Sequence, residues 1–162
     1  MTDPRLARWQ LRKNGELLLR MTPPRAGQDL RPVESQSWSA NWGSFLEQHP
    51  DLQPRLEHSE TFPRERLRDR LGEIVAPDRE HVLVVSLPDV PDVVGFGAGC
   101  VAGRGVDVVD YVVGLIQDDI FVVHELFVLD EPEGTILLVD QDDEEHPGEV
   151  LVQRFRWPEF DG

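Results

Sequence analysis

The second half of the chain is a succession of short apolar runs, and this pattern limits the fold more than any other feature of the sequence. From His81 onward, runs rich in Val, Ile and Leu are separated by short segments that contain Gly, Pro, Asp or Glu. Runs of this kind, bounded by turn-forming residues, are typical of β-strands. Because consecutive strands without crossover helices pair in antiparallel fashion, we expect a mainly antiparallel sheet.

Five or six strands are expected in this half. The apolar runs are 81–87, 92–101, 106–116, 120–129, 134–140 and 149–157. Gln117-Asp118-Asp119 is expected to join the third and fourth runs in a hairpin, and the acidic segment 141–148 is expected to join the last two. The expected arrangement in this half is therefore a meander.

The N-terminal segment is expected to form a β-hairpin. The runs 8–12 and 16–20 flank Lys13-Asn14-Gly15. An Asn-Gly pair between two such runs favours a type I′ turn, because both central residues of that turn need positive φ.

Two to three helices are expected between this hairpin and the sheet. One helix would begin at Ser37 or Ser39 and would place Trp38, Trp42 and Phe45 on one face. Residues 51–57 are expected to add a short turn. A further helix is expected over 61–75, with Pro63 at its first position and Pro77 after its end. The predicted fold class is therefore α+β, with the helices packed on one face of the sheet.

Charge is distributed unevenly along the chain, whose net charge is −15. Residues 1–81 hold 13 basic and 13 acidic side chains, whereas residues 82–162 hold 3 basic and 18 acidic ones. A negative field repels nucleic acid and anionic lipid, and it attracts basic protein surfaces. We therefore expect no nucleic-acid or membrane partner and consider a basic protein partner, with solubility of the sheet as the alternative role of the acid.

Length and composition suit one intracellular domain over residues 1–162. The single cysteine, Cys100, excludes an internal disulfide, and no apolar run approaches the roughly 20 residues of a membrane helix. The first residues also lack the apolar segment of a secretory signal. We therefore expect a cytoplasmic protein. Lys13 is the single lysine among 16 basic residues, and we associate this arginine bias with a bacterial source.

The densest acidic segment is a candidate surface for a basic partner. Its carboxylates are Asp140, Asp142, Asp143, Glu144 and Glu145. A calcium loop of the EF-hand type needs glycine at its sixth position and glutamate at its twelfth, and the segment has Glu145 and Leu151 there. The segment is therefore interpreted as a partner-binding surface or as a solvated hairpin tip.

A glycine-rich run at 95–105 is the second candidate site. Gly95, Gly97 and Gly99 share one parity, so in a strand they would leave one face bare. A packed helix, another backbone or a ligand would fit against that face. As a ligand groove it would be completed by Trp38 and Trp42. The run also matches a dinucleotide-binding pattern, but we expect strand rather than helix after it and therefore do not favour that function.

The sequence contains few signals of a specific function. We find no catalytic motif, no metal-ligand spacing and no cofactor motif. The first hypothesis is a non-enzymatic interaction protein, such as an adaptor, an inhibitor or an immunity-like protein, whose acidic half binds a basic partner. The alternative is a small-molecule-binding protein or enzyme that uses the groove at 95–105. Association of two copies through an exposed strand edge is left open.

Overall fold

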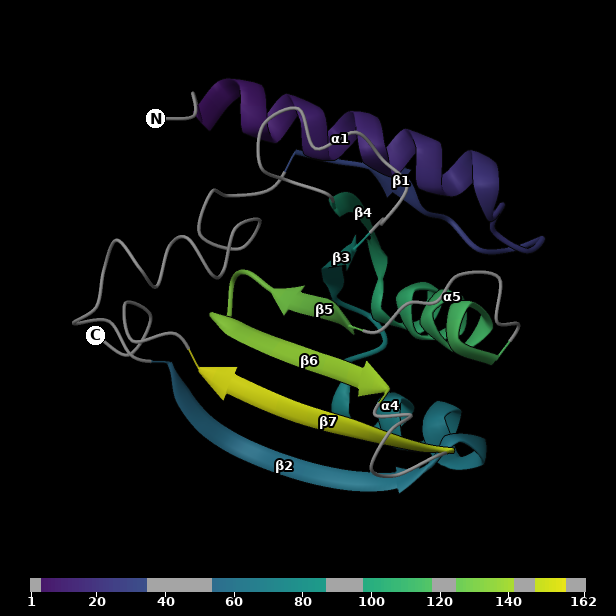
Figure 1. Cartoon of the computed structure of the whole chain (residues 1–162), viewed down its shortest axis with the longest axis vertical. Helices are drawn as coiled ribbons and strands as arrows, with labels where there is room; N and C mark the ends of the chain where they lie inside the picture. Colours follow the sequence, from purple (N-terminus) through teal and green to yellow (C-terminus); the bar gives the residue numbers. More distant parts are fainter. Residues whose placement is uncertain (1–3, 35–53, 87–97, 118–124, 142–147, 157–162) are drawn as a thin grey trace.

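The computed structural model has an α+β fold built on one antiparallel sheet (Figure 1), which confirms the predicted fold class. It describes residues 4–34, 54–86, 98–117, 125–141 and 148–156. Within these ranges seven strands pair in the order β1-β4-β3-β5-β6-β7-β2, and every neighbouring pair is antiparallel. The elements in chain order are α1 (Pro4–Met21), β1 (Arg31–Pro32), β2 (Arg55–Pro63), the 3-10 helix η1 (Arg64–Arg66), α4 (Leu67–Ile74), β3 (Glu80–Ser86), β4 (Ala98–Arg104), α5 (Gly105–Gln117), β5 (Glu125–Asp130), β6 (Thr135–Gln141) and β7 (Glu149–Arg156).

The strand predictions near the C-terminus are confirmed. β3 occupies the first Val-rich run, and β5 overlaps the second half of the predicted run 120–129 and ends one residue beyond it. β6 and β7 form the expected antiparallel pair, with Ile136 opposite Phe155 and Val139 opposite Val152. The pattern is reliable here because each strand is short, rich in apolar residues and bounded by Gly or acidic residues.

The predicted N-terminal hairpin is wrong, because residues Pro4–Met21 form the helix α1. Leu11, Asn14 and Leu18 are buried at helical spacing, so one stripe of α1 faces the sheet. Asn14 and Gly15 lie inside this stripe rather than at a turn. Local turn preference is a weak force, and it is overridden here by packing of the helix against β4.

The second correction concerns residues 106–116, which were predicted as a strand paired in a hairpin with the next run. They belong to the helix α5. A continuous apolar run is compatible with either a buried strand or a buried helix, because periodicity does not distinguish the two. Val108, Val112 and Leu115 are all buried in α5 together with most of the residues between them. Burial on nearly every side removes the polar face that would have revealed helical periodicity.

The segment 55–75 also differs from the expectation. The strand β2 was not predicted, and it pairs with β7 at the edge of the sheet. Pro63 ends β2 instead of starting a helix, and the helical part begins with η1 and continues as α4. The other predicted helix, with Trp38, Trp42 and Phe45, lies outside the described residues.

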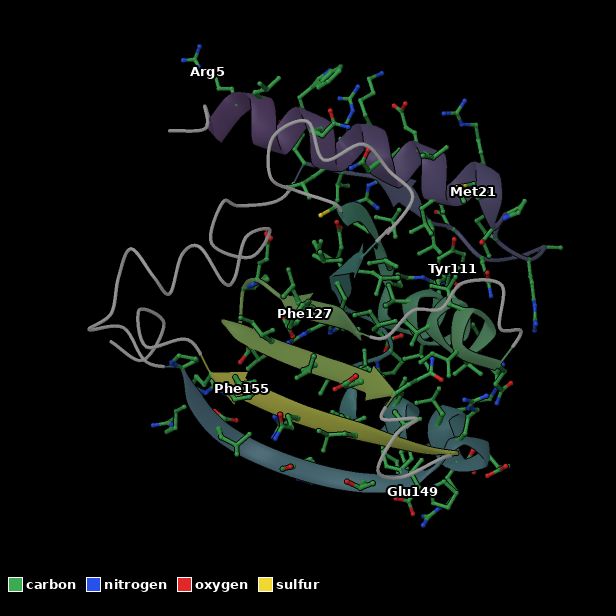
Figure 2. All side chains as sticks on the ribbon, in the orientation of Figure 1. Arg5, Met21, Tyr111, Phe127, Glu149 and Phe155 are labelled. Atoms are coloured by element: carbon green, nitrogen blue, oxygen red, sulfur yellow. The ribbon has the colours of Figure 1, made fainter. Side chains whose placement is uncertain are left out.

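The described helices pack on one face of the sheet, as predicted, and we call this the helix-covered face. Leu18 of α1, Leu71 of α4 and Val112 of α5 join one core with sheet residues such as Leu83 and Val139. Tyr111 on α5 points toward the C-terminal end of α1 (Figure 2), and its hydroxyl donates to the Thr22 carbonyl at 2.7 Å. α1 and α5 are thereby fixed to each other as well as to the sheet.

Candidate functional site

The helix-covered face changes from apolar to polar along β5, β6 and β7. Neighbouring residues in register share a face, and so do residues two apart on one strand. The first row, Leu126–Val139–Val152, is wholly apolar and belongs to the core. The next row is Val128–Leu137–Arg154, and the one after it is Asp130–Thr135–Arg156. The core therefore ends in a polar region that is built into the sheet itself.

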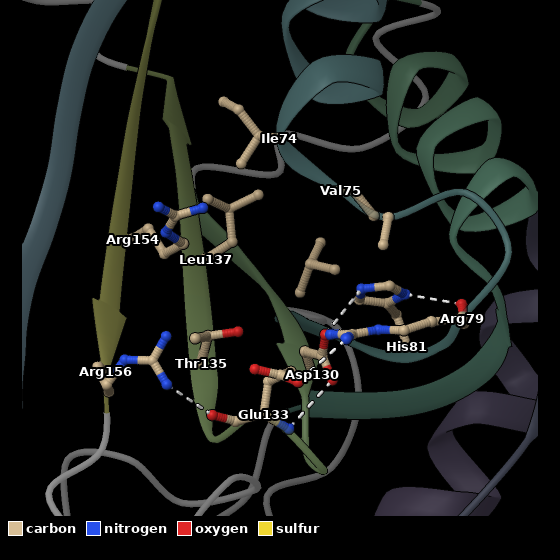
Figure 3. A pocket seen from close by; sticks show the side chains of 12 residues that line it. Ile74, Val75, Arg79, His81, Asp130, Glu133, Thr135, Leu137, Arg154 and Arg156 are labelled. Atoms are coloured by element: carbon tan, nitrogen blue, oxygen red, sulfur yellow. Dashed lines mark hydrogen bonds and ion pairs between the residues drawn. The ribbon is translucent and has the colours of Figure 1, made fainter. Parts of the chain in front are cut away.

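A cavity of about 280 Å³ lies over these last two rows. Its apolar lining comes from the sheet and from the end of α4, with Ile74, Val75, Val128 and Leu137. Its polar lining comprises Arg79, His81, Asp130, Glu133, Thr135, Arg154 and Arg156 (Figure 3). Because three arginines line it, we call it the arginine cavity.

Arg79 holds one side of the arginine cavity together. Its guanidinium pairs with Asp130 and, at 3.2 Å, with Glu133. Its carbonyl oxygen accepts a hydrogen bond from the Gly105 amide at 2.8 Å, which anchors the start of α5. The loop before β3, the first residue of α5 and the end of β5 are therefore fixed to one another through this residue.

His81 is almost fully buried beside that ion pair, with 4% of its surface exposed. Its Nδ1–H donates to the Arg79 carbonyl at 2.9 Å, which assigns the tautomer, and its Nε2 lies 3.6 Å from Asp130 Oδ2. Burial lowers the pKa of His81 below its usual value, and the positive charge of Arg79 also lowers it. His81 is therefore neutral at neutral pH and has an unprotonated Nε2.

Arg154 and Arg156 hold the opposite side of the arginine cavity. Both pair with Glu57 of β2, whose pKa is lowered chiefly by its hydrogen bond to Arg156 and also by the charges of the two arginines. Arg156 also donates from Nη1 to the Glu133 carbonyl at 3.0 Å (Figure 3).

Arg154 is the less fully engaged of the two. Its Nε is buried and has no hydrogen-bond partner, and the nearest carboxylate oxygen, Glu57 Oε2, is 3.5 Å away. Its side chain remains 39% exposed. A buried N–H without a partner carries a free-energy cost.

The predicted glycine groove is occupied by protein at its described end. Gly99 lies in β4, and a Cβ there would be 2.8 Å from the carbonyl carbon of Asn14 in α1. Gly95, Gly97, Trp38 and Trp42 lie outside the described residues, so that part of the groove remains a prediction. The glycine run is also not the strand-to-helix turn of a dinucleotide site, because Gly99 and Gly103 are inside the strand. The helix that we did not expect does follow it, at Gly105.

The predicted acidic surface is described at one residue. Asp140 lies near the end of β6 and is half-buried. Asp142, Asp143, Glu144 and Glu145 lie outside the described residues, so the proposed partner surface also remains a prediction.

The arginine cavity contains none of the residues predicted to form a site. One signal was present in the sequence, since Arg154 and Arg156 are two of the three basic residues after position 81. Their spacing of two puts both on one face of a strand. The contributions of Arg79, Asp130 and Thr135 depend on sheet register, which the sequence alone did not provide.

The part of the chain that the structure describes contains neither a reactive cysteine nor a cluster of metal ligands. Burial raises the pKa of the Cys100 thiol to about 12, so the reactive thiolate is not formed near neutral pH. No group of three or more His, Cys, Asp or Glu side chains within the described ranges is placed to hold a metal ion. Among the same residues, no helix combines the length and the apolar character needed to cross a membrane.

Comparisons of the chain with protein-family models, with curated proteins and with solved structures find no match. The physical properties of the arginine cavity are therefore the basis for a functional proposal.

Proposed function

We propose that this protein binds a small anionic molecule in the arginine cavity. The observation that carries the proposal is that Arg79, Arg154 and Arg156 line one cavity, where the side chain of Arg154 is still 39% exposed. Guanidinium groups bind carboxylate and phosphate oxygens through paired N–H donors. An anion in the cavity would bind to the exposed part of the Arg154 side chain.

The surroundings of Arg154 support this role. Thr135 lies between Asp130 and Arg156 in the sheet register, so its hydroxyl lines the same cavity as the arginines. The opposing ion pairs, Arg79–Asp130 and Arg156–Glu57, fix the walls of the cavity before a ligand arrives. A preformed site loses less entropy on binding than one that must be ordered by its ligand.

The first test is thermal unfolding with and without inorganic phosphate, sulfate, acetate or hexanoate, at ionic strength matched with NaCl. A ligand at 100 times its Kd stabilises the folded state by about 2.7 kcal/mol. For a chain of this size, this corresponds to a rise in Tm of roughly 5–10 °C. At least one of these anions should raise Tm in the wild type, and Arg154→Gln should abolish that rise.

The matched control is Arg66→Gln, because Arg66 is exposed on η1 and does not line the arginine cavity. This variant loses the same charge and should retain the wild-type response. If none of the four anions raises Tm, or if Arg154→Gln responds like the wild type, the proposal is wrong.

A second proposal is kept for the acidic half, in which Asp140–Glu145 binds a basic protein partner. The support for it is the concentration of 18 acidic residues in positions 82–162. The two proposals concern different residues, so either can hold without the other.

A further inference from the structure

The charges around the arginine cavity limit the charge of its ligand. The cavity is lined by three cations, Arg79, Arg154 and Arg156, and by two anions, Asp130 and Glu133, which leaves one positive charge in excess. His81 adds none at neutral pH, because burial and the charge of Arg79 lower its pKa by more than its hydrogen bond to the Arg79 carbonyl raises it. Glu57, which pairs with Arg154 and Arg156 from outside the cavity, also pairs with Arg55, so the excess of one positive charge remains. A phosphate group, at about −1.5 to −2, would leave uncompensated negative charge beside Asp130 and Glu133.

The shape of the cavity indicates the rest of the ligand. Val75, Val128 and Leu137 are nearly fully buried and form an apolar floor, which Ile74 extends at the end of α4. In Figure 3 the guanidinium groups of Arg154 and Arg156 lie on one side of this floor, next to Leu137 and Thr135. An apolar body would cover the floor while an anionic end reached the arginines. The volume of about 280 Å³ is just below the usual range for drug-sized ligands, about 300–1,000 Å³.

We infer that the ligand is a small monocarboxylate with an apolar body, whose carboxylate binds Arg154 and whose body lies on Val128, Leu137 and Ile74. This inference rests on the anion binding proposed above. A carboxylate carries a single charge and matches the fork of a guanidinium with two parallel hydrogen bonds. The apolar body would gain binding energy mainly because its own apolar surface leaves water when it packs on the floor.

The experiment is isothermal titration calorimetry of the full chain with acetate, butanoate and hexanoate, and with inorganic phosphate and hexan-1-ol as comparison ligands. Each added methylene that reaches the floor should tighten binding by about fourfold. Hexanoate should therefore bind more tightly than acetate, and hexan-1-ol and phosphate should bind much more weakly than hexanoate. Arg154→Gln should remove hexanoate binding, whereas Arg66→Gln should leave it unchanged.

A second variant tests the apolar floor without emptying the core. Ile74 is partly buried at the end of α4, so Ile74→Thr keeps a β-branched side chain and makes one wall of the cavity polar. This variant should reduce the gain from acetate to hexanoate by at least threefold and should leave acetate binding unchanged. Unfolding in urea checks that the variant is folded.

The outcomes separate this inference from the proposed function. If acetate and phosphate bind with dependence on Arg154 but chain length has no effect, the monocarboxylate inference is overturned and anion binding stands. If hexan-1-ol binds as tightly as hexanoate, the carboxylate is not what Arg154 recognises, and the inference is again wrong. If no anion binds with dependence on Arg154, both fail.

Discussion

At the scale of single residues, His81 has the environment with the clearest functional consequence. Its imidazole is buried between the Arg79 carbonyl and the Asp130 carboxylate, and the Arg79 guanidinium lies next to both. A protonated ring there would be poorly solvated and would compete with Arg79 for Asp130. The neutral form is therefore the one compatible with the observed arrangement of the arginine cavity.

This arrangement predicts a specific dependence of stability on pH. The unfolded chain protonates His81 near pH 6.5, but the folded chain does so at lower pH because burial lowers its pKa. Between these values the unfolded state binds more protons, so the free energy of unfolding should fall as the pH drops from about 7.5 to about 5.5. In His81→Asn this part of the slope should disappear, since the amide can donate to Arg79 but does not titrate.

Urea unfolding of both proteins at several pH values measures the two slopes. His58→Asn is the control, because His58 is partly exposed on β2 and lies outside the arginine cavity. It should leave the contribution of His81 in place. Equal slopes for the wild type and His81→Asn over this pH range would contradict the assignment of His81 as the buried neutral group.

At the scale of elements, the contact between α1 and β4 depends on glycine on both sides. A Cβ at Gly15 would lie 3.0 Å from the carbonyl carbon of Cys100 and closer still to its oxygen, and a Cβ at Gly99 would press on the Asn14 backbone. Helix and strand therefore approach backbone to backbone. The spacing of the glycines predicts a strand face without side chains. In the described residues this face is covered by α1 and not by a ligand.

Substitution of two helical glycines tests this contact. Gly15→Ala should lower the free energy of unfolding by about 1–3 kcal/mol, because the new methyl group meets backbone that cannot rotate away. Gly72→Ala is the matched control, since Gly72 is exposed in α4 and nothing lies within 4 Å of its added Cβ. It should raise stability by about 0.5–1 kcal/mol through helix propensity alone. Urea unfolding measures both values, and stabilisation by Gly15→Ala would refute the close approach.

At the scale of the whole molecule, the charge asymmetry of the sequence is partly cancelled in space. Arg68 pairs with Asp110, and Arg79 pairs with Asp130 and Glu133, so arginines from the first half neutralise acids of the second. Ten of the 18 acidic residues after position 81 lie outside the described ranges, including four of the five in the predicted partner surface.

The effect of salt on retention of a basic protein tests the predicted partner surface at Asp140–Glu145. The tagged full chain should retain a basic protein at low ionic strength, and neutralising Asp142, Asp143, Glu144 and Glu145 to Asn or Gln should abolish retention. In 1 M NaCl, where charges are screened within about 3 Å, retention should also be lost. Neutralising the exposed Glu65 and Asp69 is the control and should have little effect. A partner that survives 1 M NaCl, or that binds the neutralised variant equally, would rule out an electrostatic surface.

The strands β3, β6 and β7 are predictable from the sequence alone, because each is a short apolar run that neighbouring turn-forming or acidic residues delimit. The sequence did not determine α1 or α5. In α1 the buried stripe contains Asn14 and Gly15, which resemble a turn, and in α5 burial on nearly every side hides the helical period.

The arginine cavity was decided by tertiary structure. Sheet register places Thr135 between Asp130 and Arg156, and the loop before β3 brings Arg79 to them from more than 50 positions earlier in the chain. Local patterns report which residues share a face of one strand, and they correctly group Arg154 with Arg156. The choice of neighbouring strand and its register depends on how the whole core packs, so the chemistry of this face becomes visible only when the sheet is assembled.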